Sequence, residues 1–181
     1  MPIEPPACQI GASAPDFQLP DVNGNSVSLS DFAGTSGLVV AFICNHCPYV
    51  KAVINDFVTD ANLLMDEGIG VVAIMSNDYD SYPDDSPQKM IDFAIEHKFG
   101  FPYLVDESQD IARRYEAVCT PDLFGFNSDF RLQYRGRLDN LRMERNTDRT
   151  PDLVNAMLEI KRSGVFTGDQ KPSAGCSIKW R

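Results

Sequence analysis

The 181-residue chain lacks any apolar run close to the roughly 20 residues that a membrane-spanning helix needs. Residues 1–6 contain neither a basic region nor a hydrophobic stretch, so they do not resemble a secretory signal. Positive charge is also scarce: 16 Lys and Arg stand against 26 Asp and Glu, for a formal net charge of −10. Such an acidic chain disfavours nucleic acid and anionic membranes as partners. We therefore expect a cytoplasmic protein that binds neither.

Cysteines are few and do not form the dense, even framework of a small secreted domain. The five positions are Cys8, Cys44, Cys47, Cys119 and Cys176. Only Cys44 and Cys47 form a close pair. In a reducing compartment such a pair is expected to be catalytic or metal-binding rather than structural.

Buried strands and amphipathic helices alternate along the chain. Residues 38–43 and 69–75 are continuous apolar runs, typical of strands buried on both faces. Between them, apolar residues recur every three or four positions over 50–65, which predicts a helix with one buried stripe. Ser86-Pro87 and Thr150-Pro151 are helix starts. This order predicts an α/β fold with a mixed central sheet and helices on both faces.

The remaining segments complete the predicted domain. Residues 1–35 are expected to form an N-terminal extension with a β-hairpin, and a second hairpin is expected near residues 123–135. A single domain is predicted over 1–166. Residues 167–181 are predicted to be a C-terminal tail that could pack near the active site.

Cys44-Asn45-His46-Cys47 directly follows the first buried strand and leads into the helix, with Pro48 in its first turn. A helix N-terminus offers unpaired N–H groups and a positive partial charge, which lower the pKa of a nearby thiol. We expect Cys44, at the more exposed edge, to be the nucleophile and Cys47 to be the resolving cysteine. His46 and Asn45 are placed to tune the pair, although His46 could also be an exposed turn residue without an electrostatic role.

A metal site, a haem attachment site and a structural disulfide are the alternatives to a redox pair. Cys44, His46 and Cys47 offer at most three ligands, and the sequence has no second paired set, so a closed four-ligand zinc site is not expected. Haem attachment needs a histidine after the second cysteine, where Pro48 stands. A structural disulfide would contribute little in a reducing cytoplasm. We expect neither a metal nor a cofactor.

The strand, the C-x-x-C pair, the helix and the later Thr120-Pro121 together resemble the thioredoxin-like superfamily. In that family the proline is cis and packs against the cysteine pair, and the preceding backbone is free to pair with a substrate. The resemblance implies that Thr120 and Pro121 position the substrate here. Base rates alone would favour an ordinary trans proline.

The Ala-Pro-Asp-Phe motif at residues 14–17 and the long stretch between Cys47 and Pro121 are similar to the alkyl hydroperoxide reductase C/thiol-specific antioxidant (AhpC/TSA) branch, which includes peroxiredoxins. The similarity covers nearly the whole chain and includes a group with a Gly-Cys-x-Ile-Lys-Trp tail, here residues 175–180. It implies a thioredoxin-like fold with redox-active cysteines.

Two family patterns are incomplete in this sequence. Peroxiredoxins carry P-x-x-x-[TS]-x-x-C, in which a hydroxyl and an arginine activate the cysteine. Counted back from Cys47, Cys44 takes the hydroxyl position, and no arginine stands near Thr120-Pro121. The tryptophan and the buried aspartate of thioredoxins are replaced by Ile43 and Leu38.

We therefore expect a thiol-disulfide oxidoreductase that uses the Cys44/Cys47 dithiol on protein or small-molecule thiols and disulfides, with an electron donor that the sequence does not identify. Two alternatives stay open: an atypical antioxidant thiol peroxidase with Cys47 peroxidatic and Cys44 resolving, and a metal carrier that binds through the two thiols. Cys119 and Cys176 are candidates for further redox roles. A buried inert thiol is the commoner outcome for Cys119, and a free thiol in the tail is the alternative for Cys176.

Overall fold

A mixed five-stranded sheet forms the centre of the computed structural model, which describes residues 2–141, 143–145 and 148–181. The strands lie in the order Tyr103–Val105 (β5), Gly70–Met75 (β4), Gly37–Phe42 (β3), Asp122–Asn127 (β7) and Leu132–Gly136 (β8). β3, β4 and β5 run parallel, whereas β7 and β8 are antiparallel to their neighbours. The mixed sheet confirms the prediction.

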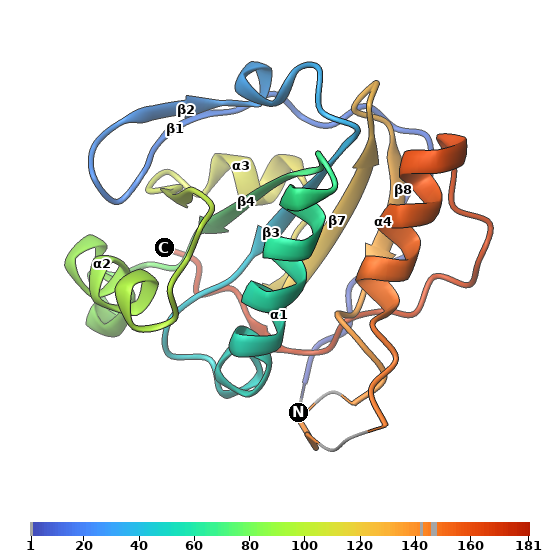
Figure 1. Cartoon of the computed structure of the whole chain (residues 1–181). Coiled ribbons are helices and arrows are strands. Elements are labelled where there is room, and N and C mark those ends of the chain that lie inside the picture. Colours follow the sequence, from blue (N-terminus) through green and yellow to red (C-terminus); the bar gives the residue numbers. More distant parts are fainter. Residues whose placement is uncertain (1, 142, 146–147) are drawn as a thin grey trace.

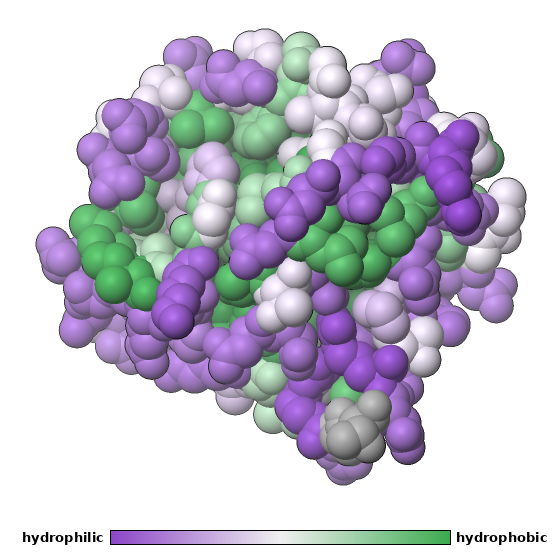
Figure 2. Space-filling view, in the orientation of Figure 1, coloured by the Kyte–Doolittle hydropathy of each residue, from purple (hydrophilic) through white to green (hydrophobic). Residues whose placement is uncertain are grey.

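Helices cover both faces of the sheet (Figure 1). They are Pro48–Asp66 (α1), Pro87–Glu96 (α2), Asp110–Arg114 (α3) and Asp152–Ser163 (α4), with short 3₁₀ helices at Leu29–Phe32 (η1) and Pro83–Asp85 (η2). α1 and α4 pack on one face, and α3 packs on the other. Among the described residues, no helix is both long and apolar enough to cross a membrane. Polar side chains cover most of the face shown in Figure 2, with apolar patches between them.

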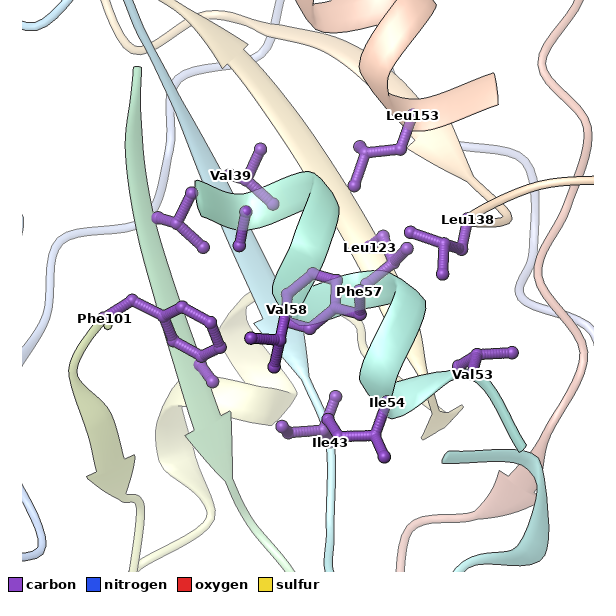
Figure 3. Packing of buried hydrophobic residues seen from close by; sticks show 14 of the residues in the cluster. Val39, Ile43, Val53, Ile54, Phe57, Val58, Phe101, Leu123, Leu138 and Leu153 are labelled. Carbon is purple, nitrogen blue, oxygen red and sulfur yellow. The ribbon is translucent and has the colours of Figure 1, made fainter. Parts of the chain in front are cut away.

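The core fixes α1 against the sheet. Side chains of β3 alternate between the faces: Val39 points into the cluster beneath α1, and Val40 into the cluster beneath α3. Ile54 and Phe57 of α1 meet the sheet in the first cluster (Figure 3). Each such buried side chain stabilises the fold by about 1.5–3 kcal/mol. The start of α1, where the cysteine pair lies, is therefore held firmly at the end of β3.

Both ends of the chain add small antiparallel pairs. Gln18–Pro20 (β1) and Ser26–Ser28 (β2) form the predicted N-terminal hairpin. Cys176–Ser177 (β9) pairs with Cys119–Thr120 (β6), a pairing that the sequence analysis did not predict. In Figure 1 the red C-terminal segment passes behind the start of α1 and ends near the end of β4, where the Asp78 N–H donates to the Lys179 carbonyl. The division of the chain into a domain and a tail stays a prediction.

Candidate active site

The cysteine pair lies between the end of β3 and the start of α1. Cys47 is the N-cap residue of α1, and Pro48 is the first helical residue, a position whose N–H has no helical partner. The side chains are buried, with residue exposures of 1% for Cys44 and 0% for Cys47. Neither thiol is exposed, so the exposed edge that we expected at Cys44 is not seen. Thr120 contacts both sulfurs and is paired with Cys176 of the tail.

The surroundings favour the thiolate on Cys47. The Cys44 thiol, as a hydrogen-bond donor, is the main influence that lowers the pKa of Cys47 to about 4, and it acts against burial. The Cys176 thiol and the backbone N–H groups of Val50 and Cys176 lower this pKa further. The pKa of Cys44 moves the other way, since its hydrogen bond to Cys47, burial and the Asp85 carboxylate raise it. These shifts favour Cys47 over Cys44 as the thiolate, and which of the two thiols attacks the substrate stays a prediction.

The Thr120–Pro121 peptide bond is cis and lies against the cysteine pair, as the family resemblance implied. The Thr120 hydroxyl lies 3.3 Å from Cys44 Sγ. Its carbonyl oxygen lies 3.2 Å from Cys47 Sγ and accepts a hydrogen bond from that thiol when it is protonated. This carbonyl opposes thiolate formation, but the donors around Cys47 outnumber it. The role of Thr120 and Pro121 in substrate positioning stays a prediction.

Asp85 brings a fully buried carboxylate to the site, which the sequence analysis missed. It accepts hydrogen bonds from the Asn45 backbone N–H at 2.8 Å and from Asn77 Nδ2 at 2.8 Å, and it lies 2.6 Å from His46 Nδ1. The carboxylate raises the pKa of His46. Although burial raises the pKa of Asp85, its hydrogen bonds from His46 and Asn77 give a net lowering. The two side chains thus form a hydrogen-bonded pair that favours the protonated imidazole, and any tuning by His46 depends on Asp85.

Long-range partners explain why this part of the site could not be found in the sequence. Asp85 ends η2, in a polar stretch before α2, and it is 40 residues from Asn45. Tyr103 on β5 is another such residue: its hydroxyl donates to Asn45 Oδ1 at 2.9 Å across 58 residues. No local spacing marks either residue as an active-site group. An open cleft of about 510 Å³, lined in part by Asn45 and His46, adjoins them.

The other two candidate redox cysteines lie in different surroundings. Cys176 is half-buried, and burial and the neighbouring Cys47 raise its pKa to about 11. Cys119 is fully buried on β6, and burial and the Asp122 carboxylate raise its pKa to about 12. The structure therefore brings Cys176, but not Cys119, to the thiolate.

Three side chains of this site are potential metal ligands. Cys44, His46 and Asp85 can each offer one ligand atom, and these atoms lie within 4.8 Å of one another. Asp85 replaces Cys47 in the set that the sequence suggested. Its oxygens are already satisfied by the backbone of Asn45 and by the side chains of Asn77 and His46. Metal carriage stays an untested alternative.

The sequence profile of the AhpC/TSA family matches residues 10–139. The chain belongs to the AhpC/TSA family. A Mycobacterium tuberculosis protein named as a peroxiredoxin is 28% identical to it over 115 residues, which are 64% of this chain and 68% of that protein. Membership confirms the branch that the sequence resembles.

Solved structures show how widely the fold is shared. An uncharacterized conserved protein from Geobacillus kaustophilus is 43% identical with a TM-score of 0.93, and the match covers 100% of this chain and 97% of that one. A hypothetical protein from Sinorhizobium meliloti is 36% identical with a TM-score of 0.92, over 98% of both chains. The thioredoxin domain of a thiol-disulfide oxidoreductase from Bacteroides vulgatus is 19% identical with a TM-score of 0.66, over 85% of this chain and 99% of that one. That more distant likeness confirms the thioredoxin-like fold.

Proposed function

We propose that the protein is a thiol-disulfide oxidoreductase whose dithiol is Cys44/Cys47. The observation that carries the proposal is the Cys47 sulfur, which lies at the N-terminus of α1 with a pKa lowered to about 4 and with the Cys44 thiol as its neighbour. A thiolate is the nucleophile of disulfide exchange, and a second thiol within reach can resolve the intermediate. Membership in the AhpC/TSA family supports the same class of chemistry.

The reaction begins with attack of the Cys47 thiolate on one sulfur of a substrate disulfide. A Cys47–substrate disulfide forms, the substrate S–S bond breaks, and the first substrate thiolate leaves. That thiolate takes the Cys44 proton, and Cys44 then attacks Cys47 Sγ. The mixed disulfide breaks, a Cys44–Cys47 disulfide forms and the second substrate thiolate leaves. The substrate gains two electrons, and the dithiol loses them.

Neighbouring groups support these steps. In this proposal Thr120 and Pro121 position the substrate, and His46, held by Asp85, tunes the pair together with Asn45. The substrates are protein or small-molecule disulfides, and an electron donor of the thiol class restores the dithiol. The cytoplasm stays the predicted compartment.

Trapping the mixed disulfide tests this assignment. The reduced Cys44→Ser/Cys176→Ser variant lacks both thiols that adjoin Cys47, so bis(2-hydroxyethyl) disulfide should leave a stable mercaptoethanol adduct on Cys47 in acid-quenched mass spectra. Wild-type protein should form the Cys44–Cys47 disulfide instead. Cys119→Ser is the matched control, because it removes a buried thiol away from the thiolate, and it should behave as wild type. An adduct on Cys44 in the Cys47→Ser variant, with none on Cys47 in the double variant, would restore the original order of roles. No adduct on either cysteine would refute the proposal.

Thiol peroxidase activity, and with it an antioxidant role, is the second candidate because a Cys47 thiolate, with its pKa lowered to about 4, could also attack a peroxide. The Cys47 thiolate would attack a peroxide oxygen to give a sulfenic acid and an alcohol or water, and Cys44 would then form the disulfide with loss of water. Two features oppose efficient peroxide reduction. Cys44 stands where the family has a hydroxyl. Arg135, an arginine that could activate a peroxidatic cysteine, is instead paired with Asp122, with its Nη2 2.7 Å from Oδ2. Hydrogen peroxide consumption at a rate equal to or above disulfide exchange would favour the peroxidase.

A further inference from the structure

The tail occupies the backbone edge that precedes the cis proline. β9 pairs antiparallel with β6, so that Thr120 faces Cys176 and Cys119 faces Ser177. The Ile178 N–H extends this ladder with a bond to the Val118 carbonyl at 3.0 Å. An extended peptide that adds to a strand edge forms main-chain hydrogen bonds of this kind. The chain's own C-terminal segment is therefore bound as such a peptide would be.

Gly175 shows how tightly the tail is seated. A Cβ atom on Gly175 would overlap the Thr120 carbonyl oxygen and lie 2.6 Å from the carbonyl carbon, closer than side-chain carbons approach backbone atoms. The Gly175 N–H and carbonyl are also both bonded to Ile3, at 3.2 Å and 2.9 Å. Only a glycine fits between these two backbone segments.

Anchors beyond β9 hold the tail across the active site. The Lys179 N–H donates to Asn77 Oδ1 at 2.9 Å, and the Lys179 carbonyl accepts from the Asp78 N–H and from Gln109 Nε2, each at 2.8 Å. Arg113 lies over the Trp180 ring at 4.4 Å. Asn77 is also a partner of Asp85, so the tail is tied to the same buried network as His46.

This seating leaves Cys47 between two thiols. Thr120, which pairs with Cys176, has its carbonyl oxygen 3.2 Å from the Cys47 sulfur, and the Cys44 and Cys176 thiols both lower the pKa of Cys47. Cys44 is buried, whereas Cys176 is half-exposed. A disulfide moved from Cys44–Cys47 to Cys47–Cys176 would therefore shift from the interior toward solvent, where a protein reductant can reach it.

We propose that Cys176 is a third redox cysteine, carried by a tail segment that occupies the substrate-docking edge, and that it exchanges with the Cys44–Cys47 disulfide. This inference rests on the proposed function, which generates that disulfide. The Cys176 thiolate attacks Cys47 Sγ, the Cys47–Cys176 bond forms and the Cys44–Cys47 bond breaks. Cys44 leaves as a thiolate and takes the proton that Cys176 lost. The exchange transfers no net electrons and needs no additional oxidant.

The Cys44→Ser variant tests the new disulfide directly. Oxidised with stoichiometric diamide and mapped by mass spectrometry under acid quench, it should convert almost completely to one intramolecular Cys47–Cys176 disulfide. Cys44→Ser/Cys176→Ser should form none, and Cys44→Ser/Cys119→Ser should behave as Cys44→Ser. Intermolecular Cys47 dimers with Cys176 still reduced would overturn the inference. Failure of the proposed function is distinct, because the wild-type chain would then form neither a Cys44–Cys47 nor a Cys47–Cys176 disulfide with bis(2-hydroxyethyl) disulfide.

The Gly175→Ala variant tests occupancy of the edge. The added methyl group should push the tail off Thr120, which prevents the Cys47–Cys176 disulfide in the Cys44→Ser background. In the otherwise wild-type chain it should speed reduction of insulin, a bulky substrate, several-fold. Ser177→Ala is the control, since it alters β9 without a backbone clash and should change neither result. A rate of insulin reduction like that of wild type, in a Gly175→Ala protein that has lost the disulfide, would overturn the docking-edge role. The Cys44→Ser result tests the disulfide even if Gly175→Ala does not fold.

Discussion

Two cysteines, Cys47 and Cys119, lie close to the Thr120–Pro121 peptide in opposite electrostatic environments. Both are completely buried, yet the pKa of Cys47 is lowered to about 4 and that of Cys119 is raised to about 12. Cys47 meets thiol and backbone donors at the N-terminus of a helix, whereas at Cys119 burial and the Asp122 carboxylate outweigh Arg135 and the Ser173 donor. Burial alone therefore does not decide whether a thiol is reactive. The donors that share the buried space decide it.

The largest expected effect is the loss of disulfide reduction when Cys47, the thiol with the lowered pKa, is replaced. Cys47→Ser should reduce the rate of bis(2-hydroxyethyl) disulfide reduction to the uncatalysed background, because no other thiol combines a lowered pKa with neighbouring thiols that can resolve the intermediate. Cys119→Ser should leave the rate unchanged. Thiol release measured at pH 7 on both variants checks this, and equal losses of activity would contradict the contrast.

The second largest expected effect is a loss of protein stability when the ion pair near Cys119 is broken. The Arg135–Asp122 ion pair is almost completely buried, so Arg135→Leu should leave an unpaired buried carboxylate and destabilise the reduced protein by about 3–5 kcal/mol. Urea unfolding followed by circular dichroism measures the loss. Lys89→Ala, which removes an exposed pair with Asp92, is the matched control and should cost about 0–1 kcal/mol. A loss below 1 kcal/mol for Arg135→Leu would show that this pair does not stabilise the site.

The smallest expected effect is a change in the pKa values of His46 and Cys44, the neighbours of Cys47. Asp85 raises the pKa of His46 and contributes to the raised pKa of Cys44, so Asp85→Asn should lower both. The His46 ring protons report its titration by NMR, with His97 as the internal control. Since the pKa of His46 is raised and that of Asp85 is lowered in the folded state, the stability they contribute is greatest between about pH 4 and 6.5 and declines as pH rises through the folded His46 pKa. An unchanged His46 pKa in Asp85→Asn would refute this pairing.

Short-range sequence patterns predicted two central strands and two helix positions correctly. Apolar runs located β3 and β4, apolar periodicity located α1, and Ser86-Pro87 located the start of α2. The family resemblance supplied the cis bond at Pro121. These features depend on neighbours in the chain or on a motif that the sequence displays.

Contacts between distant segments limited the prediction of the site. Asp85 reaches Asn45 and His46 only because η2 folds over the start of α1. The tail reaches Thr120 through an antiparallel pairing of two-residue strands, which are too short to give a recognisable pattern in the sequence. That pairing brings Cys176 to Thr120 beside the cysteine pair, so both thiols are buried, and their order in the reaction stays a prediction.

The most direct test of the account is a pH titration of thiolate absorbance at 240 nm in the reduced protein. The account predicts a step with a midpoint near pH 4 that persists in Cys119→Ser and disappears in Cys47→Ser. Cys44→Ala and Cys176→Ala should each shift the midpoint upward, because each removes a donor to the thiolate. A step near pH 4 that survives in Cys47→Ser and disappears in Cys44→Ser would contradict the assignment of the thiolate to Cys47.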